Sequence, residues 1–411
     1  MNVHVIKTVP VSYQMVVEAY RKVKQGGKAA GIDQESWADF ERKEVERELY
    51  VIWNRMASGS YFPQAVREVE ILKKDGKTRK LGIPTIRDRI AQEVVKKYME
   101  QRIDAHFHPN SYGYRPLKSS RQAIEQVRQN CLQLDWVIDM DISKFFDEID
   151  HDLLLKAIDA MKLENWVKMY VQRWLQMKVV KADGAMYDRG NKGTPQGGVI
   201  SPLLANLFLH YGLDMWLEKN YPQTRFVRYA DDAVVHCKDK AEAEQVLSAI
   251  EGRLNQIGLR LNEGKTKIVY CKDYRRRQNH EQVQFGFLGY SYQPRQTQKK
   301  GNRFMAFTAE ISKENQKKIR ENIRETINWR NTTMEIEQIA EKLNSKLRGW
   351  INYFELYSKR QLRKTMFYLE EKLVKWLSRK HNQGTRKTLL QVQKLRQQKP
   401  TLFYHWEKGY C

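Results

Sequence analysis

Apolar positions recur with helical spacing over two long stretches of the chain. Residues 11–58 follow this pattern with a glycine-rich break at 24–33, and the pattern returns almost unbroken from residue 311 onward. Ile319, Ile323 and Ile327 are spaced by four, which predicts one buried helix face. Further helices are predicted between these stretches: 88–107, one beginning near 151, one beginning at 201 with serine as N-cap followed by proline, and 241–256.

Shorter segments alternate between apolar and polar residues or are rich in β-branched residues, which predicts strands. These are hairpins at 66–84, 179–190 and 226–237 and a buried strand at 134–142. The basic, polar segments 272–280 and 293–303 show neither pattern and are predicted to be loops, the second marking a domain boundary. The pattern therefore predicts a mixed α and β region followed by an almost wholly helical one.

The balance of charge narrows the choice of partner. Lys and Arg number 73 against 49 Asp and Glu, a net charge of +24. Residues 301–411 hold 24 of the basic and 11 of the acidic residues, so this last quarter carries over half of the surplus. A surplus of this size favours a polyanionic partner, with nucleic acid ahead of an anionic membrane surface. Because 41% of residues are hydrophobic, packed cores can form and a disordered basic tail is excluded.

Other classes are excluded by what the sequence lacks. No apolar run reaches the roughly 18 residues of a membrane-spanning helix, and residues 1–16 lack the apolar stretch of a secretory signal. The four cysteines lie too far apart for a disulfide framework or a zinc knuckle, which fits a reducing cytosol: Cys131, Cys237, Cys271 and Cys411. The length of 411 residues favours two to three modules.

Acidic residues interrupt two of the apolar strand segments. Asp231 and Asp232 stand at the centre of 226–237, and Asp141 lies near the end of 134–142. A solvated turn is the simpler explanation for an Asp–Asp pair. If the two segments are neighbours, however, three carboxylates converge, and such a group suits hard divalent cations. Two Mg²⁺ ions about 3.5–4 Å apart would then clamp the attacking and leaving oxygens of a phosphoryl transfer.

These segments resemble the motifs of reverse transcriptases, most closely those of the group II intron reverse transcriptase/maturase family. Tyr-Ala-Asp-Asp at 229–232 resembles the family hallmark, and Asp-Ile-Ser-Lys-Phe-Phe at 141–146 resembles its partner motif. Other short segments are similar to family motifs and follow in the expected order: 81–89, 111–116, 193–206, 258–267, 287–289 and the maturase signature at 343–354.

The resemblance implies an α+β fold, a right-hand polymerase with fingers and an antiparallel palm sheet, followed by an all-helical thumb and maturase domain. It implies an N-terminal extension over 1–60, fingers and palm over 61–293, thumb and maturase over 294–371, and a short basic DNA-binding region over 372–411. No His-Asn-His nuclease sequence follows Trp406, so an endonuclease-lacking member is expected.

The resemblance also implies roles for individual residues. Asp141, Asp231 and Asp232 would be catalytic and, with the backbone carbonyl of Ile142, would bind two Mg²⁺ ions, for which Mn²⁺ could substitute. The incoming dNTP would be held by Lys73 and Arg79 on its triphosphate and by Gln196, while Phe146 would exclude a 2′-hydroxyl. The alternative is that Phe145 and Phe146 are both core residues, and this suits Phe145 better than Phe146. Primer and template would be contacted by a further group: Tyr229, Ala230, Lys265 and Arg115, the last of which could contact the fingers instead.

The leading interpretation is a Mg²⁺-dependent RNA-directed DNA polymerase with maturase activity. It would add dNTPs to a primer 3′ end on intron RNA during retrohoming and would help the intron to fold and splice. Its partners would be group II intron RNA, the template–primer duplex, dNTPs and target DNA, in the bacterial cytoplasm and away from membranes, as a monomer or a dimer. Two alternatives stay open: a host-adopted enzyme of DNA repair or CRISPR adaptation, and a non-catalytic splicing cofactor that binds RNA.

Overall fold

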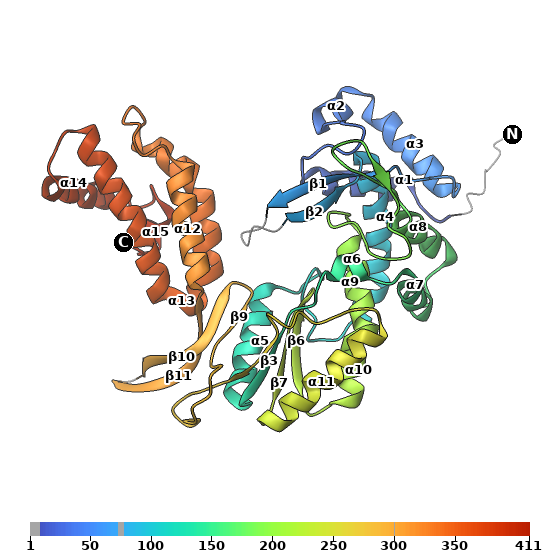
Figure 1. Cartoon of the computed structure of the whole chain (residues 1–411). Coiled ribbons are helices and arrows are strands. Elements are labelled where there is room, and N and C mark those ends of the chain that lie inside the picture. The colour runs from blue at the N-terminus through green and yellow to red at the C-terminus, as the bar shows by residue number, and fades with distance from the viewer. Residues whose placement is uncertain (1–8, 73–77, 300) are drawn as a thin grey trace. The chain divides into compact units, whose positions relative to one another are not determined.

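The computed structural model describes residues 9–72, 78–299 and 301–411 (Figure 1). The chain forms two compact units, each assembled from two separate stretches of sequence. The first contains the residues up to Ala123 together with Met140–Lys267, and the second contains Ile124–Asp139 together with Ile268–Cys411. The predicted domain limits do not coincide with this division.

Most of the helices belong to the first unit, and several begin where a short polar side chain caps them. Ser12, Thr85 and Asp150 each accept a hydrogen bond from the backbone N–H three residues on. The helices are α1 (Tyr13–Lys24), α2 (Trp37–Arg42), α3 (Val45–Ala57), α4 (Ile86–Ile103), the 3₁₀ turn Asp104–His106, α6 (Phe145–Glu148), α7 (His151–Ala160), α8 (Asn165–Leu175), α9 (Ser201–Leu209), the π-helical turn His210–Asp214, α10 (Met215–Asn220) and α11 (Lys240–Gln256).

The start of α9 differs from its prediction by one residue. Ile200 is the N-cap, and Ser201 is already the first helical residue. The Ser201 hydroxyl donates a hydrogen bond to the Pro195 carbonyl at 2.9 Å instead of capping the helix. The serine therefore fastens the preceding loop, which contains Gln196, to the helix.

The hairpins predicted at 66–84 and 179–190 form one four-stranded sheet in the order β2-β1-β4-β5. Its first two strands, β1 (Val66–Leu72) and β2 (Thr78–Ile83), pair antiparallel, while β4 (Val179–Val180) joins β1 in parallel and pairs antiparallel with β5 (Met186–Tyr187). The turn 73–77 lies outside the described residues.

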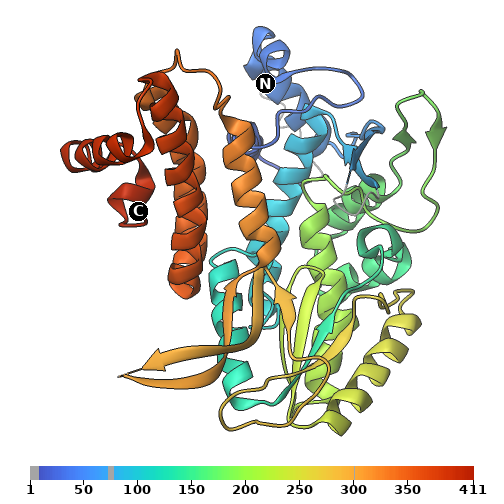
Figure 2. The same ribbon diagram turned by 60° about the vertical axis from the view of Figure 1, so that its left-hand side comes forward.

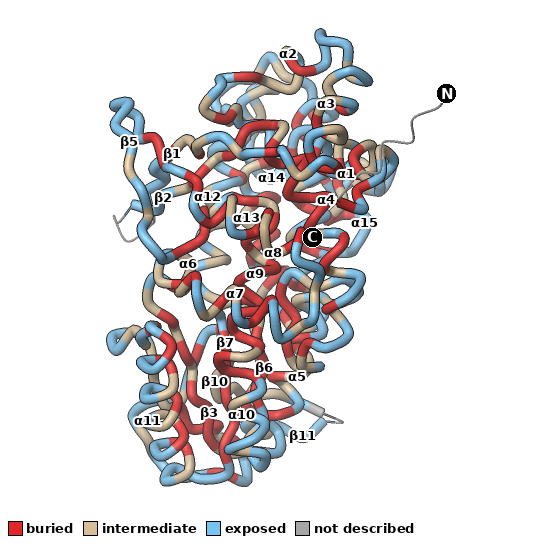
Figure 3. Tube along the Cα trace, turned by 90° about the vertical axis from the view of Figure 1, so that its right-hand side faces the viewer, coloured by how far each residue is buried: buried red, intermediate tan, exposed pale blue. Residues whose placement is uncertain are grey.

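The hairpin that carries the paired aspartates is also confirmed. Strand β6 (Arg225–Tyr229) pairs antiparallel with β7 (Asp232–Cys237), and the register ends at Tyr229 opposite Asp232. Every residue of β7 after Asp232 is buried, as the tube in Figure 3 shows. The hairpin is therefore a largely buried support with acidic residues only at its tip.

In the second unit, one prediction is wrong. Segment 293–303 is not a loop but the outer end of a long antiparallel ribbon of β10 (Tyr290–Lys299) and β11 (Asn302–Ile311), to which β9 (Phe285–Phe287) adds a third strand (Figure 2). The predicted boundary at 293/294 thus lies inside a strand. The outer half of β11 is largely exposed on both faces, so it lacks the apolar alternation that would identify a strand. This unit also contains most of β3 (Trp136–Met140) and β8 (Lys267–Tyr270), which are neighbours in a sheet, and most of α5 (Ser120–Gln133).

The residues after 311 are mainly helical, as predicted: α12 (Lys313–Thr326), α13 (Ile336–Lys380), α14 (Thr385–Gln398) and α15 (Tyr404–Glu407). Ile319, Ile323 and Ile327 are all buried. Helix α13 is bent at Ser358, where the backbone leaves the helical conformation. The predicted boundary at 371/372 falls inside this helix.

Candidate active site

The paired aspartates lie at a turn that the neighbouring chain holds closely. Ala230 has a left-handed backbone with φ of +57°, which turns the chain between β6 and β7. Gly113 lies directly against this turn, since a Cβ there would come within 2.4 Å of the Ala230 nitrogen. The 111–116 segment is also bonded to β6, because the Tyr112 N–H donates to the Arg228 carbonyl at 2.8 Å. The glycine is therefore required by the close approach of two backbones.

Asp141 lies just beyond β3 and is fixed by the segment before Lys265. Its carbonyl accepts the Asn262 N–H at 2.8 Å, and the Ser143 N–H donates to the Arg260 carbonyl at 2.9 Å. The Asn262 side-chain amide donates to the Asp141 carboxylate at 2.9 Å, and the Lys265 ammonium lies 3.3 Å from both carboxylate oxygens. Neither backbone bond uses the carbonyl of Ile142.

The structure brings the three predicted carboxylates close enough for the charge of one to shift the pKa of another. Partial burial, followed by the charges of Asp231 and Asp141, raises the pKa of Asp232 to about 6. Burial also raises the pKa of Asp231, and the charge of Asp141 adds to this increase, whereas Arg79 opposes it. We call Asp141, Asp231 and Asp232 the acidic cluster. Its members repel one another, so a bound cation would stabilise their ionised form.

The donor set of the acidic cluster fits a divalent cation, although its geometry is not that of a closed metal site. Carboxylate and carbonyl oxygens are the ligands that Mg²⁺ prefers. Among the described residues, no three His, Cys, Asp or Glu side chains are already arranged to hold a metal ion. In this conformation the Asp141 carboxylate is instead engaged by Lys265 and Asn262.

A buried ion pair beneath the turn was not predicted from the sequence. Arg228 and Asp214 are both fully buried, and the guanidinium donates two hydrogen bonds to the carboxylate, one of them at 2.8 Å. Arg228 also donates to the Ala230 carbonyl at 3.0 Å and to the Asn206 side chain at 2.9 Å, while Asn206 donates to the Gly113 carbonyl. The network therefore ties the turn to α9 and to the π-helical turn. An arginine within the apolar run 226–237 was its only signal in the sequence.

Two of the predicted dNTP-binding side chains contact each other. The Arg79 guanidinium donates to the Gln196 side-chain oxygen at 2.7 Å, and the Gln196 amide donates to Asp147 at 3.3 Å. Phe146 is half-buried, whereas Phe145 is buried, so the structure agrees with the core assignment for Phe145 alone. Lys73 lies outside the described residues.

The predicted primer and template residues have different environments. Tyr229 is half-buried at the end of β6, with its ring centroid 6.3 Å from that of Tyr114. The Lys265 side chain is exposed beside the acidic cluster. The Arg115 guanidinium is buried and bonded to Asp104 and to the carbonyl of Ser111. These bonds hold Arg115 against its own segment, and its contact with the template or the fingers stays a prediction.

Comparisons with known proteins agree with these motifs. The family model described as reverse transcriptase (RNA-dependent DNA polymerase) matches residues 71–292, and the model of the group II intron maturase-specific domain matches residues 316–393. The chain is 34% identical to Protein YkfC of Escherichia coli K12, over 55% of this chain and 68% of that protein. It is 26% identical to the group II intron-encoded protein LtrA of Lactococcus lactis, over 89% of this chain and 72% of that protein. In the described part of the chain, none of the helices has the length and apolarity needed to cross a bilayer.

Proposed function

The chain belongs to the reverse transcriptase family and carries a group II intron maturase domain, and from this we propose that it copies intron RNA into DNA during retrohoming and assists the intron to fold and splice. The polymerase would extend a primer 3′ end with dNTPs. The acidic cluster, two of whose members stand at a turn held by a buried ion pair, is the observation that carries the proposal. Rigid placement of like charges is what metal-assisted phosphoryl transfer requires.

Asp141, Asp231 and Asp232 would hold two Mg²⁺ ions, with the Ile142 carbonyl as a further ligand. The ions, when bound, would supply the positive charge that activates the primer 3′-hydroxyl and stabilises the leaving pyrophosphate. The Lys265 side chain is exposed, so its ammonium could move away from the Asp141 carboxylate and leave that carboxylate free to bind a metal ion. Mn²⁺, which takes similar oxygen ligands, would substitute for Mg²⁺.

The incoming dNTP would meet Arg79, Gln196 and Phe146. The bond between Arg79 and Gln196 positions the guanidinium fork, which suits phosphate oxygens. The half-buried ring of Phe146 would lie where a 2′-hydroxyl projects, so that ribonucleotides are excluded by contact. Lys73 would add a second cation to the triphosphate. Tyr229 and the small Ala230 would lie under the primer end.

The helical region after residue 311 would supply the maturase activity and contact intron RNA. On α12, Lys313, Lys317 and Arg324 are exposed. Lys317 lies 3.8 Å from Glu321, and Arg324 lies 3.9 Å from Glu325. In this reading the right-hand architecture has fingers and palm over 61–293 and a thumb with the maturase region over 294–371. The basic residues after 372 would bind target DNA.

Primer extension on an RNA template with dNTPs and Mg²⁺ tests the polymerase. Intact protein should extend the primer and Asp231→Ala should not. No extension by the intact protein would overturn the polymerase proposal. A splicing assay on a group II intron RNA at low Mg²⁺ tests the maturase separately, and an unchanged splicing rate with the protein present would overturn that part alone.

A further inference from the structure

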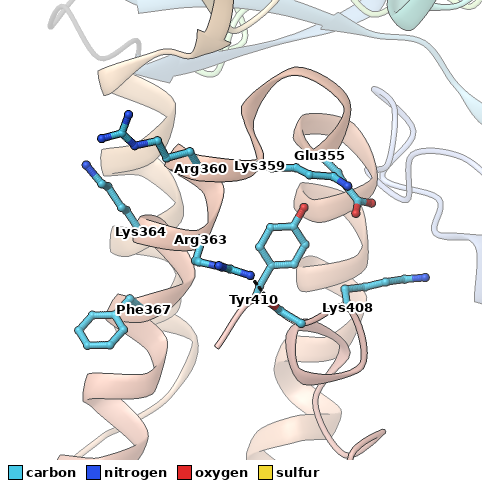
Figure 4. Close-up of a pocket in the computed structure, with 9 residues that line it drawn as sticks. Glu355, Lys359, Arg360, Arg363, Lys364, Phe367, Lys408 and Tyr410 are labelled. Atoms are coloured by element: carbon cyan, nitrogen blue, oxygen red, sulfur yellow. Dashed lines mark hydrogen bonds between the residues drawn. The ribbon is translucent and has the colours of Figure 1, made fainter. Parts of the chain in front are cut away.

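A pocket of about 680 Å³ lies between α13 and the C-terminal segment, and all the residues that line it belong to the second unit (Figure 4). Five cationic side chains line it: Lys359, Arg360, Arg363, Lys364 and Lys408. We call this site the basic pocket. Its volume is in the range that encloses one small organic ligand rather than a duplex. The roles proposed above concern the whole basic region after residue 311 and name none of these five residues.

The walls of the basic pocket are fixed by the bend in α13 and by the folding back of the chain end. At the bend, the Ser358 hydroxyl accepts the Ile311 N–H at 2.6 Å. At the other wall, the Arg363 guanidinium donates to the Gly409 carbonyl at 3.1 Å. The C-terminal segment is anchored beyond the pocket, because the indole N–H of Trp406 donates to the buried Glu370. The pocket is therefore a built feature of the packed unit.

The positive charge of the basic pocket is not neutralised by the protein. Within residues 301–411, none of its five cations lies within ion-pair distance of a carboxylate, whereas Lys318, Lys380 and Lys399 each do. Glu355 is the single acid in the lining. Burial, followed by the charge of Glu355, raises the pKa of Tyr410 to about 12, so its hydroxyl stays neutral. An anionic ligand would supply the missing charge.

An aromatic ring completes the lining. Phe367 belongs to α13 one turn beyond Arg363 and Lys364, and it is 58% exposed. A large apolar ring beside exposed cations is costly in water but suits a nucleotide, because the ring stacks on the base while the cations hold the phosphates. The α13 side of the pocket also lies within residues 316–393, which match the maturase-specific domain.

We propose that the basic pocket binds one unstacked nucleotide of a single-stranded RNA segment, with its base on Phe367 and its flanking phosphates on Arg360, Arg363 and Lys364. The inference rests on the proposed maturase function and identifies where that function grips its RNA. Recognition of this kind targets loops, bulges and ends, whose bases can leave the stack.

Binding of a labelled twelve-nucleotide uridine RNA to the full chain, followed by fluorescence anisotropy, tests this proposal. Phe367→Ala should weaken binding about tenfold, and Phe367→Leu should lose less, because stacking on an aromatic ring contributes roughly 5- to 150-fold per base. The double variant Arg360→Gln with Lys364→Gln should weaken binding and reduce the salt slope by about 1.4, which is two phosphate contacts at about 0.7 each.

The matched control removes two positive charges in the first unit, with Lys156→Gln and Lys219→Gln, both exposed, outside the pocket and without an assigned role. This control should retain affinity within about twofold, and thermal unfolding should show that every variant is folded. An equal loss in the control, no loss in Phe367→Ala, or an equal effect of Phe367→Ala on duplex RNA would overturn the proposal. Tighter binding of the matching thymidine DNA strand would overturn it in favour of a DNA site.

Failure of the pocket and failure of the maturase function give different results. If the variants lose RNA affinity but the intact protein does not promote splicing, the pocket stands and the maturase proposal falls. If the protein promotes splicing and the variants bind RNA like the intact chain, the pocket proposal falls alone.

Discussion

The acidic cluster and the basic pocket both gather like charges, but the fold supports them in different ways. Asp231 and Asp232 stand at a turn held by the fully buried Arg228–Asp214 pair and by close packing against Gly113, and Asp141 is held by Asn262. The five cations of the basic pocket are exposed side chains. Its walls are held by hydrogen bonds to backbone groups, of Ile311 with Ser358 and of Gly409 with Arg363. Chemistry on a phosphate needs fixed atoms, whereas attraction of a nucleic acid needs charge that can adapt.

The largest expected effect separates these two uses of charge. Asp231→Asn preserves shape and removes one carboxylate from the acidic cluster, so primer extension should fall about 10³-fold, equivalent to about 4 kcal/mol. Affinity for the uridine RNA should stay within about twofold. The matched control is Asp183→Asn, an exposed acid in the β4–β5 loop. Steady-state extension rates decide this, and an equal loss in the control would break the comparison.

The second expected effect is on the free energy of unfolding, which should depend on the support of the acidic cluster far more than on the basic pocket. Arg228→Met leaves Asp214 buried and unpaired, so the free energy of unfolding should fall by about 3–5 kcal/mol. Arg363→Met in the basic pocket should change it by about 1 kcal/mol or less, because the side chain is exposed. Urea unfolding measures both. The double variant Arg228→Met with Asp214→Leu should recover most of the loss, and a neutral Arg228→Met would contradict the supporting role of the pair.

The elements of the active site were predictable because their signals are local. The β6–β7 hairpin, α7 and α11 each show their period in a few residues, and the family motifs mark Asp141 and Asp231. The Arg228–Asp214 pair was not predictable, since 14 positions separate its members and only packing brings them together. The β10–β11 ribbon was missed because long antiparallel pairing satisfies its backbone without an apolar face along its outer half. The basic pocket joins residues 46 positions apart, at Arg363 and Gly409.

A smaller effect concerns nucleotide selection beside the acidic cluster. Phe146→Ala should raise ribonucleotide incorporation relative to deoxynucleotide about tenfold, because the ring no longer fills the space of a 2′-hydroxyl. Phe146→Tyr keeps the ring and should keep the discrimination. Extension with competing dNTP and rNTP pools measures the ratio, and unchanged discrimination in the alanine variant would remove Phe146 as the gate.

The smallest effect follows from the desolvation of Asp232 and, after it, from repulsion within the acidic cluster. The pKa of Asp232 is raised from 3.8 to about 6, so the unfolded chain ionises this group before the folded chain does. Folding therefore loses stability as pH rises from about 4 to 6, and the loss persists above pH 6. Asp232→Asn, neutral throughout, should raise the unfolding temperature by roughly 2–4 °C at pH 8 and leave it unchanged near pH 3.

Thermal unfolding in EDTA at both pH values measures this, since divalent cations would mask the repulsion. The Lys342→Gln variant, far in sequence from the acidic cluster, serves as the control and should show the same shift at both pH values. An equal gain for Asp232→Asn at pH 3 and pH 8 would show that its charge is not the cause.

Cleavage by iron in place of magnesium tests most directly whether the acidic cluster is the cation site. Fe²⁺ with ascorbate and peroxide cuts the backbone next to where it binds, so fragments should end near residues 141 and 231–232. Added Mg²⁺ should suppress these cuts, and Asp231→Asn should abolish them while Asp183→Asn keeps them. Cuts elsewhere in the chain, or the same cuts in Asp231→Asn, would contradict the account.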